Sequence, residues 1–449
     1  MTAPESPSRP APSWREGWAV YLQPRVLIVL LLGFSSGLPL ALSGSTLLVW
    51  MRESGVDLGT IGLFALVGTP YTLKFLWAPL VDALHVPLFT RRFGRRRGWL
   101  VFSQLLLIAA ILLLALTDPA SSPLFVALGA LLVATMSSTQ DIVVDAFRVE
   151  SLPESEQAAG MASYVAAYRI GMLVSTAGAL FIVSGFEATG IPRGAAWMWG
   201  YVAMAALVLI GTVTALAATE PEQSAHAEAA TRAETAFTRV LHAAVGAFSE
   251  FLTRQDALAA LAFVVLFKFT DAFSGTMTAP FVIDIGFTRN DYAAIVKGVG
   301  LAATLIGGFA GGFVARRYSL ATSLWIGGLL QAIANLSFSW LAFVGVNQWA
   351  LAFAITAENF TSAIGTVIFV AYLSALCRNP LHTATQYALL TALAAVGRTY
   401  LSSGAGYVAK ATGWPLFFAI CVVVAVPSLM LLAWLRRRGH FEALGPVRV

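Results

Sequence analysis

Long apolar stretches alternate with short polar segments along most of the chain. A helix needs about 20 apolar residues to span roughly 30 Å of hydrocarbon, and twelve stretches are of that length. The predicted spans are 25–50, 59–82, 99–117, 123–147, 157–184, 196–218, 257–284, 290–314, 318–343, 349–377, 383–409 and 414–435. Contiguous apolar segments satisfy their backbone amides in hydrocarbon only as helices. The pattern therefore predicts an all-α integral membrane protein with twelve transmembrane helices.

The longest polar stretch divides the predicted spans into two groups of six. Connections within compact folds are usually only a few residues long, so a polar segment of this length is best interpreted as a linker between two halves. The expected organisation is an N-terminal tail (1–24), a six-helix half (25–218), a linker (219–256), a second six-helix half (257–435) and a C-terminal tail (436–449).

The two predicted halves show weak sequence similarity to each other. Arg169 lies in the middle of the fifth span, and Arg398 lies at similar depth in the eleventh span, its counterpart in the second half. Such similarity between halves is typical of transporters built from parallel repeats, in which the solute site lies between the repeats near the bilayer midplane. We therefore look for the chemistry of this chain at the interface of its halves.

The composition agrees with a chain that lies mostly in the bilayer. Of its 449 residues, 58% are hydrophobic and only 11% are charged, against about 25% charged in a typical soluble domain. The mean hydropathy is +0.77. No soluble segment of domain size remains outside the predicted spans, which argues against a receptor or sensor with an output domain.

Lys and Arg are distributed unevenly between alternate loops, and loops retained in the cytoplasm are enriched in them. Nineteen lie on the side that holds both termini: Arg9, Arg15, Arg25, Arg91, Arg92, Arg95, Arg96, Arg97, Arg148, Arg232, Arg239, Arg254, Arg316, Arg317, Arg378, Arg436, Arg437, Arg438 and Arg448. Four lie on the opposite side: Arg52, Arg193, Arg289 and Lys410. We therefore expect both tails and the linker in the cytoplasm. Basic helix ends at anionic headgroups explain the net charge of +5 without a nucleic-acid partner.

The sequence argues against an enzyme. The segment 33–37 matches G-x-S-x-G, but that motif needs a strand-turn-helix elbow and here lies inside an apolar helix. No G-x-x-x-x-G-K-[ST] motif occurs, which excludes an ATP-driven motor within the chain. The five histidines fall in or near polar loops, so no intramembrane metal cluster is expected: His85, His226, His242, His382 and His440. We predict no cofactor and transport driven by an ion gradient.

Several motifs resemble known transporters. The loop from Arg91 to Gly98 resembles the signature loop between helices 2 and 3 of the major facilitator superfamily, although its spacer from Asp82 is longer. More specific motifs resemble the AmpG-type muropeptide permeases, within the peptide and acetyl-coenzyme A transporter family. They are GFSSGLPL at 33–40, KFLWAPL at 74–80, STQDIVVDA at 138–146, YRIGMLVS at 168–175, KFTDAF at 268–273 and ATQYALLTAL at 384–393.

This resemblance implies a major facilitator fold in a bacterial inner membrane. It implies import of anhydromuropeptides, the anionic GlcNAc-1,6-anhydroMurNAc disaccharide and its peptides, by proton symport. Such import serves cell-wall recycling and, in some bacteria, β-lactamase induction and thus β-lactam resistance. The alternative is a carrier of the same fold for another anionic solute, such as a peptide, an oligosaccharide or an acyl-coenzyme A. We expect a monomer.

Nine ionisable residues fall inside the predicted spans: Lys74, Asp141, Asp145, Arg169, Lys268, Asp271, Lys297, Glu358 and Arg398. A charge at mid-bilayer costs at least about 2.5–3.5 kcal/mol, so each one needs a partner, a wet cavity or a function. A purely structural bundle does not explain so many.

Three carboxylates are candidate proton carriers: Asp141, Asp145 and Glu358. Asp141 and Asp145 are four residues apart, share a helix face and repel each other unless a proton or a cation intervenes. Asp141 is deeper in its helix and is the stronger candidate.

Each of the other two carboxylates has a structural alternative. Asp145 would join Asp82 and the arginine cluster of 91–97 in a gate at the cytoplasmic end, with Arg91, Arg92 and Arg95 as its basic members. Glu358 would form a salt bridge with Arg398 or Lys297.

The remaining candidates are predicted to bind the solute. Arg169 and Arg398 would grip a carboxylate through paired hydrogen bonds, or would instead neutralise an aspartate in their own halves. Lys268 would contact an anionic solute, or would pair with Asp271, three residues away on the same helix. Neutral donors and aromatic rings suited to sugars come from Gln140, Tyr168, Gln386 and Tyr387.

Overall fold

The structure is a computed structural model that describes residues 19–78, 81, 84–221, 256–376 and 383–444. All regular elements of these residues are helices, which confirms the predicted all-α fold. Ten continuous helical segments of the described chain are long and apolar enough to cross a membrane: Pro24–Glu53, Arg95–Ala115, Pro123–Ser151, Ala159–Ala188, Arg193–Ala217, Ala257–Asp284, Arg289–Ala315, Leu320–Val344, Gln348–Leu376 and Trp414–Arg437.

In the first half, the helical elements follow the predicted spans. The first span consists of α2 (Pro24–Leu42) and α3 (Ser45–Glu53), the third is α8 (Arg95–Ala115) and the fourth is α9 (Pro123–Ser151). The fifth span consists of α10 (Glu154–Leu173), η4 (Val174–Gly178) and α11 (Ala179–Ala188), and the sixth is α12 (Arg193–Ala217). The short helix α7 (Phe89–Phe93) precedes α8, and η1 (Val20–Leu22) precedes α2.

The second half repeats the succession of six spans. The seventh span is α15 (Ala257–Asp284), and the eighth consists of α16 (Arg289–Asp291), η5 (Tyr292–Val299) and α17 (Gly300–Arg317). The ninth, tenth and twelfth spans are α18 (Leu320–Val344), α19 (Gln348–Leu376) and α22 (Trp414–Arg437), and the short helix α23 (His440–Ala443) follows α22. The segments η4 and η5 are π-helical and contact each other across the two halves.

Two predicted spans are built from successive short helices. The second span consists of α4 (Leu58–Leu63), η2 (Phe64–Gly68), α5 (Thr69–Leu73) and η3 (Lys74–Leu76), and the eleventh consists of α20 (Thr383–Tyr400), η6 (Leu401–Gly404) and α21 (Ala405–Thr412). With these two, the described helices correspond in order to the twelve predicted spans. The assignment of the tails and linker stays a prediction, because most of their residues lie outside the described chain.

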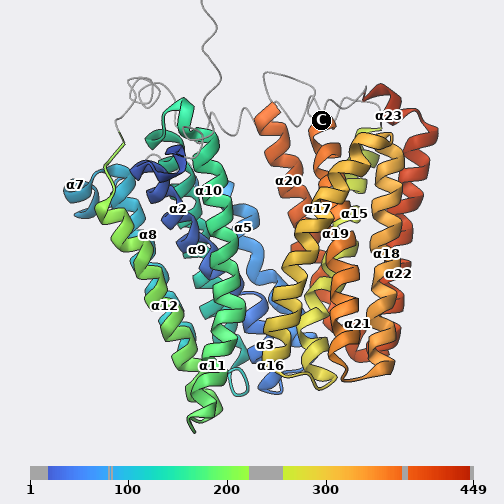
Figure 1. Cartoon of the computed structure of the whole chain (residues 1–449), viewed down its shortest axis with the longest axis horizontal. Helices are drawn as coiled ribbons and strands as arrows, with labels where there is room; N and C mark the ends of the chain where they lie inside the picture. The colour runs from blue at the N-terminus through green and yellow to red at the C-terminus, as the bar shows by residue number, and fades with distance from the viewer. Residues whose placement is uncertain (1–18, 79–80, 82–83, 222–255, 377–382, 445–449) are drawn as a thin grey trace, which may run out of the picture.

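The twelve segments form two bundles that stand side by side and converge at one end (Figure 1). The contacts between the bundles run through α4 against α21, α20 against α5, α3 against α15 and η4 against η5. Helix α2 begins, and helix α22 ends, at the opposite end of the molecule, where the bundles diverge (Figure 1). We call these the closed end and the open end.

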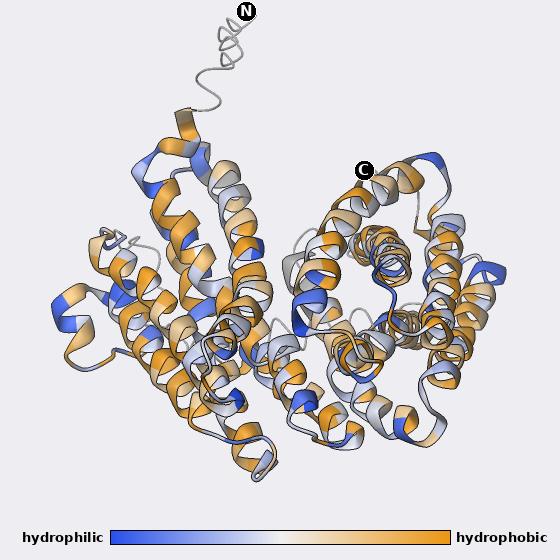
Figure 2. Ribbon diagram, turned by 60° about the horizontal axis from the view of Figure 1, so that its bottom comes forward, coloured by the Kyte–Doolittle hydropathy of each residue, from blue (hydrophilic) through white to orange (hydrophobic). Residues whose placement is uncertain are grey.

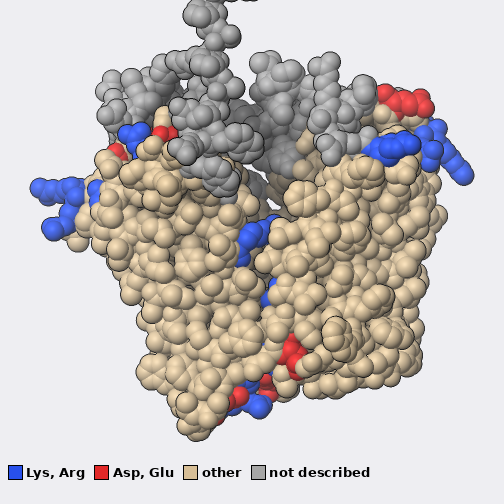
Figure 3. Space-filling model, in the orientation of Figure 1, with Lys and Arg blue, Asp and Glu red and all other residues tan. Residues whose placement is uncertain are grey.

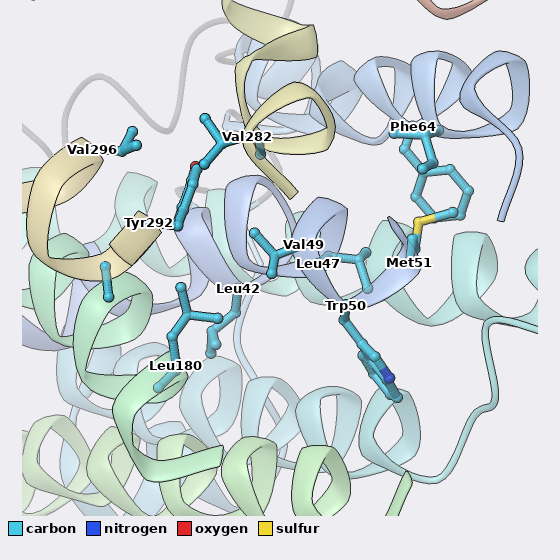
Figure 4. Packing of buried hydrophobic residues seen from close by; sticks show 14 of the residues in the cluster. Leu42, Leu47, Val49, Trp50, Met51, Phe64, Leu180, Val282, Tyr292 and Val296 are labelled. Carbon is cyan, nitrogen blue, oxygen red and sulfur yellow. The ribbon is translucent and has the colours of Figure 1, made fainter. Parts of the chain in front are cut away.

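One hydrophobic core joins the two halves at the closed end. Figure 4 shows its centre, where Trp50 and Met51 of α3 and Leu180 of α11 pack with Val282 of α15 and Tyr292 of η5. The other two buried clusters each belong to one half alone. The halves therefore share apolar packing at one end and keep separate cores toward the other.

The outer surfaces of both bundles are hydrophobic (Figure 2). Trp349 and Phe309 are 87% and 83% exposed, which a water-soluble protein would seldom allow for such large apolar side chains. In a bilayer these side chains contact lipid, and the continuous hydrogen bonds of the helices satisfy the backbone.

Helices α4 and α21 cross at two glycines. A Cβ atom at Gly406 would lie 1.8 Å from the carbonyl oxygen of Leu58, and one at Gly62 would lie 2.8 Å from the backbone nitrogen of Gly406. The contact is between backbones, so no side-chain rotation would relieve a clash there. The close approach of the halves at the closed end depends on these glycines.

Gly406→Ala is expected to destabilise this conformation by about 1–3 kcal/mol, the usual cost of overpacking. The matched control is Gly404→Ala, because a Cβ at Gly404 has no atom within 4 Å. Thermal unfolding of the two purified variants checks this, and equal melting temperatures would contradict the role given to Gly406.

Candidate functional site

A buried aspartate lies at the centre of the first half. Asp141 on α9 is only 7% exposed and accepts a hydrogen bond from the hydroxyl of Ser36 on α2. Ser36 also lies 3.3 Å from the hydroxyl of Tyr164 on α10. Three helices therefore hold the Asp141 carboxylate in place, as a buried polar group requires.

Charged groups from both sides of the seam, the interface between the two halves, interact with Tyr168, and one of them is Asp141. Asp141 interacts with Lys74 on η3 and with Asp145 on its own helix. Tyr168 on α10 interacts with Asp141 and Arg169 of the first half and with Arg398 of the second. The structure thus gathers four of the sequence-predicted residues around Tyr168, counting Asp145.

Arg169 and Arg398 both have exposed side chains in mid-chain positions of transmembrane segments. Neither forms an ion pair or a side-chain hydrogen bond with any residue that the structure describes, so the predicted alternative of neutralising an aspartate is not observed. Figure 3 shows Lys and Arg side chains in the hollow between the halves. Positive charge therefore faces the space between the halves.

The second half contains its own buried polar cluster. Lys268 on α15 lies 3.3 Å from the Asp271 carboxylate and donates a hydrogen bond of 2.8 Å to Thr366 on α19. Ser362 of α19 donates to the other oxygen of Asp271 over 2.6 Å. The predicted pairing of Lys268 with Asp271 is therefore confirmed, and both are tied to α19.

The two clusters follow one plan. In the first half, a serine of the first span donates to an aspartate of the fourth, with Lys74 as the interacting cation. In the second half, a serine of the fourth span donates to an aspartate of the first, with Lys268 as the cation. Each half therefore carries an aspartate, a serine and a lysine, with donor and acceptor helices exchanged.

Glu358 lies next to the second cluster on α19. Its carboxylate accepts a hydrogen bond of 2.9 Å from the neighbouring Asn359, and it makes no ion pair within the described chain. The predicted alternative of a salt bridge with Arg398 or Lys297 is thus not found. Lys297 instead lies over the Tyr292 ring at 5.4 Å.

The closed end is sealed by an ion-pair network that crosses between the halves. Arg289 of α16 donates two hydrogen bonds, of 2.9 and 2.6 Å, to Glu53 of α3. It donates another of 2.9 Å to Glu187 of α11 and lies 5.3 Å from the centre of the Trp197 ring. Arg289 is only 6% exposed, so its charge depends on these two carboxylates.

Two further ion pairs flank Arg289 and also join the halves. Arg52 of α3 pairs with Asp284 of α15, and Lys410 of α21 lies 3.6 Å from Asp57 before α4. A hydrogen bond from the Thr60 hydroxyl lowers the pKa of Asp57. Asp57 therefore stays ionised in mildly acidic solution, and its pairing with Lys410 is lost only as the pH falls through that lowered pKa.

At the open end, the basic loop is bound within its own half. Arg96 makes hydrogen bonds of 2.9 and 2.5 Å with Glu150 of α9, and Arg95 lies 3.4 Å from the same carboxylate. The Glu220 carboxylate accepts from the backbone nitrogens of Arg96 and Arg97 at the start of α8. The negative charge of Glu220 is favourable there, because the N-terminus of α8 is the positive end of its helix dipole.

Gly94 allows this capping contact. Its φ of +94° favours glycine, and a Cβ there would lie 2.4 Å from the Glu220 side chain. The loop from Arg91 to Gly98 thus binds α9, the end of α12 and the residues just after α12.

The predicted gating residues have different outcomes. Arg91 and Arg92 are exposed at the open end, and Arg95 contacts Glu150. Asp82 lies outside the described residues, and Asp145 lies 3.6 Å from Arg148 on its own helix. Their gating role stays a prediction.

Of the predicted sugar-binding residues, only two have described side chains. Gln140 is fully buried, and neither of its side-chain polar atoms has a hydrogen-bond partner among the described residues. Tyr168 is half-buried. The side chains of Gln386 and Tyr387 lie outside the described set.

The ion-pair network at the closed end was not predicted from the sequence. Arg52, Arg289 and Lys410 indicated only the orientation of the chain, and their partners were not predicted. The available signal was that each of these cations faces a carboxylate on the same side of the membrane, Asp284, Glu53 and Asp57. Nothing in the linear spacing indicates which residues pair across more than 200 positions.

Arg289→Gln is expected to loosen the closed end, because it leaves the Glu53 carboxylate, only 12% exposed, without its cation, a change that costs about 3–5 kcal/mol for buried pairs. The measurement is the labelling rate of Ala293→Cys, 1% exposed in the shared core, by a membrane-impermeant maleimide after Cys377 and Cys421 are changed to serine. Arg193→Gln is the control, because Arg193 pairs with Glu187 inside one half. A labelling rate unchanged by Arg289→Gln would rule out the gate.

Comparisons with known proteins agree with this architecture. The family model "Major Facilitator Superfamily" matches residues 29–400. The anhydromuropeptide permease of Escherichia coli K12 is 39% identical over 414 residues, covering 92% of this chain and 80% of that protein. A Rickettsia felis protein that carries the name transporter AmpG 4 is 34% identical, covering 92% of this chain and 97% of its own length.

Solved structures share the fold at low sequence identity. The nucleoside transporter NupG superposes with a TM-score of 0.69 at 13% identity, covering 94% of this chain and all of that one. The inward-open xylose transporter XylE of E. coli gives a TM-score of 0.62 at 13% identity, covering 90% and 95%. The chain is therefore a transporter that belongs to the Major Facilitator Superfamily and, within it, to the family of the AmpG anhydromuropeptide permease.

Proposed function

We propose that this protein imports anhydromuropeptides from the periplasm to the cytoplasm of a bacterium by symport with protons. The substrate class is supported by the 39% identical relative, which is named an anhydromuropeptide permease. The cargo is an anionic disaccharide with or without its peptide, and the imported sugar and peptide serve cell-wall recycling. The protein needs no cofactor, works as a monomer and lies in the inner membrane.

The observation that carries this proposal is the pair of unpaired arginines on opposite halves. Arg169 and Arg398 are exposed, and both interact electrostatically with Tyr168. Two guanidinium groups that face one hollow favour a ligand with carboxylates, which each fork binds through two parallel hydrogen bonds. A solute held between them would contact both halves at once, as a carrier requires.

Asp141 is suited to carry the coupled proton. It is buried in the first half, is held by one neutral hydroxyl donor, and interacts with only one cation among the described residues, Lys74. An ionised carboxylate at this depth is costly, so its protonation state will follow which face of the membrane the cavity meets. An inward proton gradient would then drive accumulation of an anion that the membrane potential alone would expel.

The observed conformation corresponds to the state that releases solute. The closed end is sealed by the Arg289 network and the open end lies where α2 begins and α22 ends. The basic residues of the open end support its assignment to the cytoplasmic face, because loops retained in the cytoplasm are enriched in Lys and Arg. On this assignment, the Arg289 network is the periplasmic gate.

The first test is uptake of a labelled anhydromuramyl disaccharide peptide into proteoliposomes, with and without an inward proton gradient. Accumulation that depends on the gradient supports both substrate class and coupling. No uptake by protein shown to be folded in the vesicles would direct the search to another anionic solute.

Asp141→Asn is expected to abolish accumulation against a gradient, while exchange of labelled for unlabelled solute continues, because the variant binds solute but cannot release a proton. Asp118→Asn is the control, since Asp118 lies in a loop and bonds only Ala120. Gradient-driven accumulation by the Asp141 variant would remove this residue from the coupling mechanism.

Arg169→Gln and Arg398→Gln are each expected to raise the KM for the peptide-bearing solute about tenfold to a hundredfold, the range for one charge-assisted hydrogen-bonded contact of about 1.5–3 kcal/mol. Initial uptake rates across substrate concentrations give the KM. Arg193→Gln at the closed-end surface should leave the KM unchanged, and an unchanged KM in both seam variants would argue against the arginine clamp.

A further inference from the structure

A small polar pocket lies inside the second half, away from the seam arginines. It is about the size of one water molecule and is enclosed by α15, α18 and α19. The lining residues all carry polar side chains: Thr270, Asp271, Ser274, Gln331, Asn335, Glu358, Thr361 and Ser362. The hydroxyl groups of this lining donate hydrogen bonds within the protein, but its two carboxylates are costly in a transmembrane bundle unless a cation or a proton lies beside them.

Two of these side chains are buried with unused hydrogen-bonding atoms. Gln331 and Asn335 on α18 are 7% and 3% exposed. The amide nitrogen of Gln331 and the amide oxygen of Asn335 have no hydrogen-bond partner among the described residues. The side-chain nitrogen of Asn335 donates a hydrogen bond to the backbone carbonyl of Gln331. The side-chain oxygen of Asn335 is therefore left as a free acceptor in the pocket.

Acceptors predominate around this space. The Asp271 carboxylate is bound by Lys268 and Ser362, but Glu358 receives only the Asn359 amide within the described chain. The other charged groups that act on Glu358 are Asp271 and Lys268 on α15 and Lys297 on η5, none within ion-pair distance of it. A carboxylate in this setting needs a proton or a cation beside it.

We propose that this pocket binds one monovalent cation through oxygen ligands, either Na⁺ or a hydrated proton, between Glu358, Asp271 and the Asn335 oxygen. Both ions match the water-sized space and the surplus of acceptors. Neutral water alone would satisfy Asn335 but would leave the Glu358 charge uncompensated.

The bound cation would act on the solute site through Asp271. This carboxylate lines the pocket and also holds Lys268, so a cation in the pocket competes with Lys268 for the same oxygens. Cation binding therefore loosens Lys268 and makes its charge available to an anion in the hollow. The proposal concerns ion binding alone and does not depend on which solute the carrier takes.

The experiment uses the purified full-length protein without any solute. One arm measures binding of ²²Na⁺ with choline as the replacement cation, and the other measures proton uptake in weakly buffered detergent solution during acid titration. Asn335→Ala and Glu358→Gln are the test variants. Ser337→Ala is the matched control, because Ser337 lies on α18 like Asn335, and its hydroxyl donates a hydrogen bond to the backbone carbonyl of Ala334 on the same helix.

If the ion is Na⁺, the wild type and Ser337→Ala bind ²²Na⁺, and both test variants lose affinity about tenfold or more, the equivalent of one lost charge-assisted contact. If the ion is a hydrated proton, ²²Na⁺ does not bind, Glu358→Gln takes up one proton fewer than the wild type, and Asn335→Ala shifts that uptake to lower pH. Either pattern supports the site.

The proposal is overturned if neither ion distinguishes the two test variants from Ser337→Ala, because the pocket then holds only water. Melting temperatures of all four proteins confirm that each is folded during the measurement. Since no solute is present, loss of muropeptide uptake in vesicles would contradict the proposed substrate while leaving this result intact.

Discussion

The cost of placing charge in hydrocarbon controls the arrangement of this molecule. Every described intramembrane carboxylate except Glu358 has a serine donor or a cation beside it, and Arg289 at the closed end is enclosed by two carboxylates. Arg169, Arg398 and Glu358 have no ion-pair partner among the described residues, and they lie at the seam or in the polar pocket. Where the protein leaves a charge uncompensated, a ligand or an ion must supply the compensation.

The closed end combines two kinds of contact that respond differently to change. The shared core and the glycine crossing of α4 and α21 depend on close packing, which is short-ranged and tolerates little displacement. The ion pairs of Arg52, Arg289 and Lys410 act over longer distances and exchange readily with water. Packing thus sets the geometry of the closed state, while the ion pairs can be released and reformed during each transport cycle.

Hydrophobic pattern was sufficient to predict the membrane spans, since span length and apolar content are local properties; even the bounds of 257–284 match α15. The pairing of Lys268 with Asp271 was predictable because helical spacing brings them together. The partners of Arg289, the exchanged serine contacts of Ser36 and Ser362, and the pocket formed by Gln331 and Asn335 were not. These depend on how helices from distant parts of the chain are rotated against each other, and a single sequence does not encode that rotation in any local pattern.

The two π-helical segments η4 and η5 face each other between the halves, next to the gate formed by Arg289 and Glu187. A π turn holds one residue more than an α turn, and its wider hydrogen bonds allow that extra residue to pass along the helix. The portion beyond it then rotates about its axis by about a quarter-turn or more while the rest of the helix stays seated. The two segments are therefore suited to a twist at the closed end of the fifth and eighth spans, which changes that end without a tilt of the whole bundle.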